Sequence, residues 1–515
     1  MQTYRLTLSA DNQPSPATFG EKRARAPSDP LTGWALAVTL SCCFLAVLWT
    51  TPINHDTAWY LVATEAWLKG AVLYEDIVEV NPPLNFYLTV PSVLLAEATG
   101  VSPDRAQLLV TTALLAGCLG WCWHLLPPLG LLRRGLLLVC LAAALVLPFL
   151  ADVAQREHVM LLFMTPWVIG KLTGAGTGHA ARAGVAALGL CLKPFFMLYP
   201  LALTGHAMMT KRSIRPAFAT DNLVFLSAGA GYVAAVAALH PQYFTDIVPV
   251  ARHVYGEYGL NTASVLLRFG SPGLALGLLL VLAMAARSKA APLGQLSLLI
   301  GAAIVIYLVQ WTGYGYQFFP IVSFVMLGLG WMLCVPGSAR GGAIPAMALL
   351  ALALLAYQAV TRGPYFSVVT EVLSLELAEL DRGTRLMAFS TSLNPGSPVA
   401  LRNDLEWTSR YPALWLVPGV VDGLAATDCS ADPDRCAALS AIEARTRADT
   451  VNDMILRRPD ILIFDHTHDY IDTPGFSWNG FFRADPRWAS VIAEFEIVRD
   501  TRDYDIYLHR RLTQD

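Results

Sequence analysis

Charged residues are scarce in this chain. Asp, Glu, Lys and Arg make up 15% of its 515 residues, hydrophobic residues make up 55%, and the mean hydropathy is +0.48. So little charge excludes an ordinary soluble enzyme of this length and favours an integral membrane protein. The formal net charge of -3 gives no basic excess, which argues against a protein that binds nucleic acid.

Several sequence signatures are missing as well. The chain has no GxxxxGK[ST] loop for nucleotide phosphates and no GxSxG hydrolase motif. It also has no internal repeat of the kind that many transporters carry, so a transporter or flippase for lipid-linked sugars is the least favoured class. Long apolar runs are what the sequence offers instead.

Those runs predict membrane helices, which need about 20 mainly apolar residues each. The longest candidate, 182–210, is interrupted by Pro194, which removes a backbone donor and clashes with the preceding turn. We therefore predict two short helices that meet at Lys193–Pro194, and about eleven transmembrane helices in all. The candidate segments are 32–50, 104–126, 135–150, 157–172, 182–210, 221–240, 271–287, 291–309, 316–335 and 343–360.

Orientation follows from Lys and Arg in short loops, which mark the cytoplasmic side. Residues 1–30 are polar and are predicted to be disordered and cytoplasmic, because they carry Lys22, Arg23 and Arg25. The later basic loops agree with this orientation if the two halves of 182–210 meet at the outer face. The C-terminus then lies outside, and the apolar stretch 84–99 does not cross.

This topology divides the chain into a transmembrane domain, 31–360, and an extracytoplasmic domain, 361–515, which is periplasmic if the cell is Gram-negative. The first outer loop spans 51–103. Residues 361–515 hold 24 Asp or Glu against 16 Arg and no Lys, which is typical of a soluble domain. Its pattern predicts a small α/β fold with a helix that ends at Gly383, strands in "RLMAFS" and "PDILIFD", a helix between them and a closing hairpin.

Cysteine is used sparingly outside the apolar segments. Cys429 and Cys436 lie in the exported domain, where oxidising conditions favour a disulfide, although two free thiols are the alternative. The other seven cysteines fall within apolar segments, where a small buried hydrophobic residue is the ordinary role.

The first outer loop carries the first candidate site residues. Asp56 follows the first apolar run, where it either solvates the exit of the helix or takes part in chemistry. The apolar and aromatic residues around it indicate a packed segment rather than a free loop. Glu79 and Asn81 follow, just before a Pro82–Pro83 pair that fixes the backbone direction.

Further candidates lie on the same predicted face. The second outer loop ends in Arg156, Glu157 and His158, and charges at a membrane helix end are costly unless they are paired or used. Lys193 either reaches lipid headgroups or binds a lipid phosphate. Tyr316 and Gln317 open a later span, where they line a donor site or belong to an interfacial aromatic belt.

The order of these residues resembles the GT-C membrane glycosyltransferases, in particular the bacterial branch of the lipid A aminoarabinose transferase and the protein O-mannosyltransferases. The likeness covers about residues 30–210 and rests on Asp56, on a second loop with acidic residues, on the Lys193–Pro194 break, and on a G-x-x-x-Y-x-D…PPL segment formed by Gly70, Tyr74, Asp76, Pro82, Pro83 and Leu84. One departure is that Val80 and Asn81 stand where the aminoarabinose branch has an acidic residue and a Lys.

The resemblance implies a GT-C-like fold and roles for these residues. Asp56 and Glu157 would be catalytic, with Asp56 either a general base or, together with Glu79, a ligand of a divalent metal cation. Lys193 would contact the carrier phosphate, with Arg156 supplying further positive charge. The remaining substrate-binding candidates are Glu79, Asn81, His158, Tyr316 and Gln317.

The resemblance also implies an activity. The protein would transfer a sugar from a polyprenyl-phosphate donor to a lipid, glycan or protein acceptor, with inversion, at the outer face of the bacterial cytoplasmic membrane. A polysaccharide polymerase or ligase that uses diphosphate-linked donors is the main alternative. It would be expected to carry several Arg in a late outer loop, whereas 241–270 has only Arg252 and Arg268.

Overall fold

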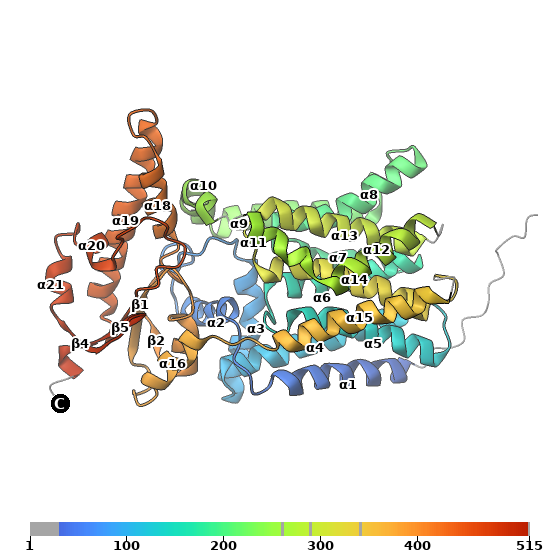
Figure 1. Cartoon of the computed structure of the whole chain (residues 1–515), viewed down its shortest axis with the longest axis horizontal. Coiled ribbons are helices and arrows are strands. Elements are labelled where there is room, and N and C mark those ends of the chain that lie inside the picture. The colour runs from blue at the N-terminus through green and yellow to red at the C-terminus, as the bar shows by residue number, and fades with distance from the viewer. Residues whose placement is uncertain (1–29, 259–261, 288–290, 339–341, 513–515) are drawn as a thin grey trace, which may run out of the picture.

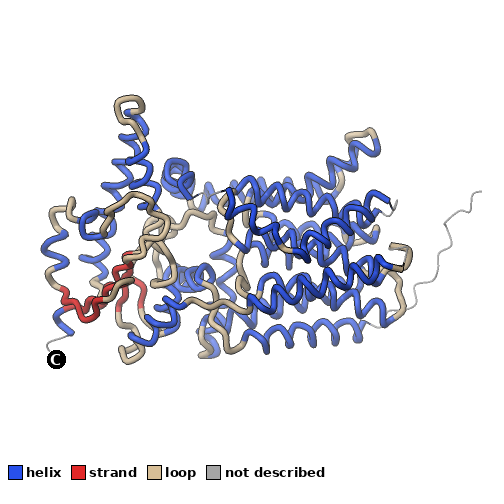
Figure 2. The backbone as a smooth tube through the Cα atoms, in the orientation of Figure 1, coloured by secondary structure: helices blue, strands red, loops and turns tan. Residues whose placement is uncertain are grey.

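The computed structural model describes residues 30–258, 262–287, 291–338 and 342–512, so the N-terminal segment predicted to be disordered lies almost wholly outside the described residues. A bundle of long helices forms one half of the molecule, and the C-terminal domain covers one end of it (Figure 1). Strands occur only in the C-terminal domain within the part of the chain described (Figure 2). The molecule is a polytopic helical membrane protein with a C-terminal α/β domain.

Within the described residues, seven helices are long and apolar enough to cross a membrane, or eight if the bent pair Thr262–Gly270 and Pro272–Arg287 is one span. The other three predicted spans are α6, α7 and α8, and the count of eleven therefore stays a prediction. The helices in question are α1 (Pro30–Leu48), α4 (Pro103–Leu125), α5 (Leu131–Val146), α6 (Arg156–Thr173), α7 (His179–Leu190), α8 (Leu198–Lys211), α9 (Thr220–Leu239), α12 (Pro272–Arg287), α13 (Ala291–Gln310), α14 (Gly315–Cys334) and α15 (Ala343–Arg362).

The break predicted at Lys193–Pro194 is present. Helix α7 ends at Leu190, Lys193 is extended, and a short 3-10 helix begins at Pro194 before α8. At about 1.5 Å per residue, α7 and α8 are about 18 and 21 Å long, which is shorter than the hydrocarbon core of a bilayer. The break brings Lys193 to the end of the bundle that faces the C-terminal domain.

Helices α2 (His55–Leu68) and α3 (Leu84–Thr99) lie between the bundle and the C-terminal domain (Figure 1). Asn54 caps α2 by accepting a hydrogen bond from the backbone N–H of Thr57. The Asn54 amide also donates to the carbonyl of Val153 at 2.7 Å, and the Thr57 hydroxyl donates to the same carbonyl at 3.2 Å. The loop before α2 and the loop before α6 are therefore tied together at the residue before His55 and Asp56.

The C-terminal domain is built on a five-stranded sheet of order β2-β1-β3-β5-β4. Strands β2, β1 and β3 are parallel, and β5 and β4 add the predicted antiparallel hairpin. The strands are β1 (Arg385–Phe389), β2 (Glu406–Trp407), β3 (Ile461–Asp465), β4 (Phe495–Asp500) and β5 (Tyr504–His509), and the helices are α16 (Val368–Glu376), α17 (Ser397–Arg402), α18 (Leu416–Ala426), α19 (Pro433–Arg457), α20 (Trp478–Phe482) and α21 (Trp488–Ile492).

The strand and helix predictions for this domain are confirmed except at α16. That helix ends at Glu376 rather than at Gly383, because Leu377 leaves the helical conformation and packs into the core beside the sheet. Strand β2 and helices α17, α18, α20 and α21 carry weak local patterns and are not among the predicted elements. Cys429, in the loop after α18, and Cys436, in the first turn of α19, form a disulfide with their Cα atoms 5.5 Å apart.

The two domains share one apolar core. Trp59, Tyr60 and Phe86 of the first outer loop region pack in the same cluster as Trp415 and Phe464 of the C-terminal domain. Backbone hydrogen bonds join the domains as well, since the N–H of Val78 donates to the carbonyl of Arg410 at 2.8 Å.

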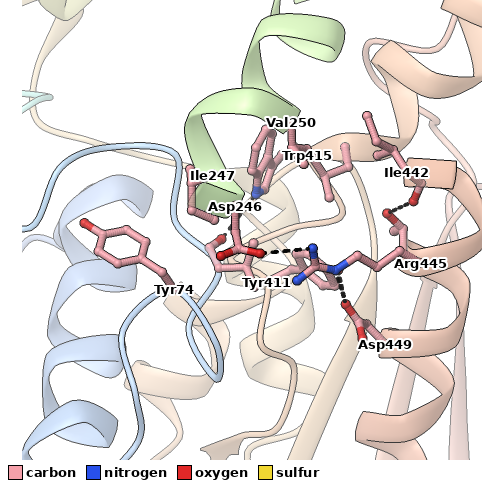
Figure 3. Close-up of a pocket in the computed structure, with 12 residues that line it drawn as sticks. Tyr74, Asp246, Ile247, Val250, Tyr411, Trp415, Ile442, Arg445 and Asp449 are labelled. Carbon is pink, nitrogen blue, oxygen red and sulfur yellow. Dashed lines mark hydrogen bonds and ion pairs between the residues drawn. The ribbon is translucent and has the colours of Figure 1, made fainter. Parts of the chain in front are cut away.

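A charged contact lies beside this shared core. Arg445 of α19 is 3.5 Å from Asp246, which precedes α10 (Val248–Val254), and also pairs with Asp449, while Tyr74 lies on the opposite side (Figure 3). The cavity there is only about 30 Å³, enough for ordered water, so we assign it to domain docking.

Candidate active site

A cavity of about 240 Å³ lies where the end of the bundle meets the C-terminal domain. Its walls come from α2, from the loop before α3, from the start of α6, from the start of α14 and from loops of the C-terminal domain. The residues that line it include His55, Asp56, Trp59, Tyr60, Glu79, Val80, Asn81, Arg156, Tyr255, Tyr314, Tyr316, Thr391, Ser392, Leu393, Asn394, Pro412, Ala413, Trp415, Asp469 and Tyr470. Five of the nine site residues predicted from the sequence are therefore brought together: Asp56, Glu79, Asn81, Arg156 and Tyr316.

Asp56 lies in the first turn of α2, where the partial positive charge of a helix N-terminus favours the carboxylate. Its side chain is 24% exposed, and the nearest cationic partner among the described residues is His55, whose Nε2 is 3.8 Å from Oδ1. No hydrogen bond occupies the carboxylate within the described part of the chain. Asp56 is thus held in place by its helix while its oxygens stay available to a ligand.

Arg156 begins α6 and is the one arginine among the described residues that line the cavity. Its side chain is buried, and Nη1 has no hydrogen-bond partner among the described residues. A buried charge without a partner is costly, so such a guanidinium marks a place where an anion binds. The hydroxyl of Tyr60 is also buried in this cavity without a partner.

Lys193 and Glu157 form a buried ion pair next to the cavity rather than in its wall. The Nζ of Lys193 is 2.5 Å from Oε1 of Glu157 and 3.4 Å from Oε1 of Gln310. The same ammonium lies 5.2 Å from the centre of the ring of Tyr316, a residue that lines the cavity whereas Lys193 does not. The pair is therefore placed to support the cavity wall through the contact of Lys193 with Tyr316.

Glu79 and Asn81 line the cavity as a hydrogen-bonded unit. Oε2 of Glu79 accepts from the indole of Trp59 at 2.8 Å, and Oε1 accepts from the backbone and side-chain amides of Asn81. The hydroxyl of Tyr74 donates to the carbonyl of Asn81 at 2.9 Å. This network fixes the loop just before Pro82.

The metal pair expected from the sequence does not fit this geometry. Both carboxylate oxygens of Glu79 already accept hydrogen bonds, so a cation shared with Asp56 would have to displace Trp59 or Asn81. Within the described residues there is also no group of three or more His, Cys, Asp or Glu side chains that could hold a metal ion.

Two predicted substrate-binding residues point elsewhere. His158 is buried, stacks on Phe149 at 4.8 Å and accepts a hydrogen bond from the N–H of Ala154. Gln317 accepts from the hydroxyl of Thr312 at 2.7 Å. Neither lines the cavity, and the geometry gives both of them a packing role instead.

Sequence reasoning missed the part of the cavity that comes from the C-terminal domain. Ser392 and Asn394 follow β1, and Asp469 and Tyr470 follow β3. The signal that could have found them is their position after parallel strands, because open α/β sheets bind ligands at the carboxyl ends of their strands.

Comparison with known proteins finds a likeness in fold but none in sequence. No family profile and no curated protein sequence matches the chain. Among solved structures, ArnT from Cupriavidus metallidurans bound to undecaprenyl phosphate superimposes with a TM-score of 0.50 at 12% identity, over 93% of this chain and 97% of that one. Apo ArnT from the same organism gives a TM-score of 0.49 at 12% identity, over 93% and 98%. The chain therefore shares the overall fold of ArnT over nearly its whole length, in agreement with the sequence resemblance.

Proposed function

We propose that the protein transfers a sugar from a polyprenyl-phosphate carrier to a lipid, glycan or protein acceptor at the outer face of the bacterial cytoplasmic membrane. The observation that carries this proposal is the buried Nη1 of Arg156, which has no hydrogen-bond partner among the described residues and lies in a cavity that also holds the carboxylate of Asp56. A neighbour of similar fold is bound to undecaprenyl phosphate, which supports a carrier of this class.

The arrangement suits displacement at a sugar carbon attached to phosphate. A lipid phosphate leaves as an anion, so the reaction needs positive charge on its oxygens more than it needs a proton, and Arg156 supplies that charge. The acceptor hydroxyl needs a base within hydrogen-bond reach, and Asp56 fills this role. One direct displacement inverts the configuration of the anomeric carbon.

The ion pair beside the cavity fits a supporting role in this scheme. Because Glu157 neutralises Lys193 and neither residue lines the cavity, we assign the carrier phosphate to Arg156 and treat Lys193 and Glu157 as positioning residues. This assignment revises the roles that the family resemblance implied for both residues.

The alternatives have less support. A polymerase or ligase with a diphosphate-linked donor needs more positive charge, and Arg156 is the one arginine or lysine in the described lining of the cavity. A flippase needs a polar path across the bilayer, whereas this cavity lies at one end of the bundle, against the C-terminal domain.

The test is binding of undecaprenyl phosphate to the purified full chain in detergent. Replacing Arg156 by Gln should weaken binding by about 10- to 100-fold, the usual worth of a charge-assisted hydrogen bond. The matched control is Arg252→Gln, which changes an exposed arginine of α10 outside the cavity lining. Equal affinity of wild type and Arg156→Gln would contradict the assignment.

A further inference from the structure

The C-terminal domain supplies one entire wall of the cavity. Three of its loops reach the cavity, and they follow β1, β2 and β3, the three parallel strands of its sheet. The side chains at this wall are Thr391, Ser392, Asn394, Asp469 and Tyr470, together with the apolar Leu393, Pro412, Ala413 and Trp415. A sheet edge of this kind is a common place for recognition of a small ligand.

Internal hydrogen bonds fix the loop that carries Asp469. The carboxylate of Asp465 accepts from the backbone and hydroxyl of Thr467 at 2.9 and 2.7 Å, and from the hydroxyl of Ser390 at 2.6 Å. Thr391 donates to the carbonyl of Asp469 itself. The side-chain carboxylate of Asp469 has no hydrogen bond or ion pair within the described part of the chain, so it is held rigidly and left free.

Asn394 is prepared in a similar way. Its Oδ1 accepts from the hydroxyl of Tyr365 at 2.5 Å, and its Nδ2 donates to Ser392 at 3.2 Å. An amide nitrogen has two hydrogens, so one N–H of Asn394 is still available to a ligand. The rings of Tyr314 and Tyr316 stack at 5.6 Å on the membrane side of the same cavity and offer a flat apolar surface.

Carboxylates outnumber cationic groups in the cavity lining. Asp56, Glu79 and Asp469 are carboxylates, and Arg156 is the one guanidinium in the described lining, with His55 beside Asp56. Once a phosphate occupies Arg156, the rest of the cavity is acidic. A ligand group placed there is favoured if it donates hydrogen bonds and disfavoured if it carries negative charge.

We infer that the transferred sugar lies against the C-terminal domain, carries no acidic group, and is recognised through its hydroxyls by Asp469 and Asn394. This inference rests on the proposed function, because it takes the carrier phosphate to lie at Arg156. It assigns the choice of sugar to the soluble domain and the transfer chemistry to the membrane domain.

Two probes test the inference on the purified full chain: undecaprenyl phosphate bearing glucose and the same carrier bearing glucuronic acid. Wild type should bind the glucosyl carrier at least about tenfold more tightly than the glucuronosyl carrier. The reason is that the carboxylate of glucuronic acid would be brought close to the carboxylates of the cavity, and such repulsion costs at least a factor of ten in affinity. Asp469→Asn should weaken binding of the glucosyl carrier. It should also bring the affinities for the glucosyl and glucuronosyl carriers to within about threefold of each other. The control is Asp472→Asn, three residues along on the exposed surface and outside the cavity lining.

The outcomes separate this inference from the proposed function. If bare undecaprenyl phosphate fails to bind wild type, the proposed function itself fails. If the bare carrier binds but wild type does not distinguish the two sugars, or Asp469→Asn keeps the wild-type ratio, the inference is overturned and the proposed function stands. Thermal unfolding of each variant checks that a loss of selectivity is not a loss of fold.

Discussion

The two walls of the cavity differ in how they hold their polar groups. On the membrane side, Arg156 in the wall and the Glu157–Lys193 pair beside the cavity are at least nine-tenths buried, at helix ends or breaks. On the soluble side, Asn394 and Asp469 sit on loops fixed by short-range hydrogen bonds. Buried charges interact strongly and are costly to move, which suits chemistry, whereas loops after strands vary easily, which suits recognition.

Near the membrane side of the cavity, the two buried cations Arg156 and Lys193 differ in whether a carboxylate pairs with them. Lys193 has a carboxylate at 2.5 Å, whereas Nη1 of Arg156 has no hydrogen-bond partner among the described residues. Removing one member of a buried pair leaves a charge uncompensated, while removing an unpartnered charge relieves a cost. Stability and activity should therefore respond differently to the two substitutions.

The largest expected effect comes from Asp56→Asn, which removes the proposed base while keeping the shape of the side chain. Transfer should fall by about 10²- to 10⁴-fold, the usual contribution of general base catalysis. The measurement compares envelope lipids and glycans of a deletion strain carrying either the wild-type or the variant gene. Asp381→Asn, on the exposed surface of the C-terminal domain, is the control. Wild-type products from a normally expressed Asp56→Asn protein would refute the assignment.

Lys193→Met should act mainly on stability. Breaking the buried pair leaves Glu157 charged and alone, which costs about 3 to 5 kcal/mol of the free energy of unfolding. The double variant Lys193→Met/Glu157→Gln removes both charges and should recover most of that loss, whereas Arg156→Gln should leave the midpoint of thermal unfolding unchanged or higher.

Thermal unfolding in detergent measures all three variants. If Lys193→Met keeps wild-type stability yet loses binding of undecaprenyl phosphate, Lys193 contacts the phosphate directly and the positioning role is wrong.

The sequence could predict which residues share a face but not how each side chain points. Charges are rare in membrane segments, so sidedness alone grouped Asp56, Arg156 and Tyr316, which do meet at one cavity. Rotation by about 100° per residue along α6 turns His158 roughly 200° away from Arg156 and into the core. His158 is therefore close to Arg156 in sequence, but its side chain does not reach the cavity.

The contacts that the sequence could not predict are those that depend on packing between distant segments. The pairing of Lys193 with Glu157 depends on how the α7–α8 break docks against α6, which no local pattern specifies. The wall formed by the C-terminal domain depends on how the edge of its sheet docks against the membrane domain. Asn394 and Asp469 lie in loops at that edge, and these loops carry no distinctive motif that would have marked them. The secondary structure of the domain was nevertheless predictable from short buried strands such as Ile461–Asp465.

The smallest expected effect is on the pH dependence of stability, and it compares one carboxylate from each domain. Burial, only partly offset by Arg362 and His55, raises the pKa of Asp152 in the second outer loop to about 6. Burial also acts on Asp460 of the C-terminal domain, but hydrogen bonds from Arg385 and Arg511 outweigh it and hold the pKa of that carboxyl below its usual value. The two groups should therefore change stability with opposite signs.

Asp152 binds its proton more tightly in the folded chain, so its contribution to stability is present at low pH and is lost as pH rises from about 4 to about 6. Asp152→Asn should consequently be more stable than wild type by about 1 kcal/mol above pH 6, with the gap closing toward pH 4. Asp460 contributes stability that is present above its unfolded pKa and is lost as pH falls through its lower folded value, so Asp460→Asn should be less stable than wild type at pH 7. Midpoints of thermal unfolding from pH 4 to 8 measure the stability difference between wild type and each variant. If that difference changes with pH in the same way for both variants, Asp152 is no more desolvated than Asp460.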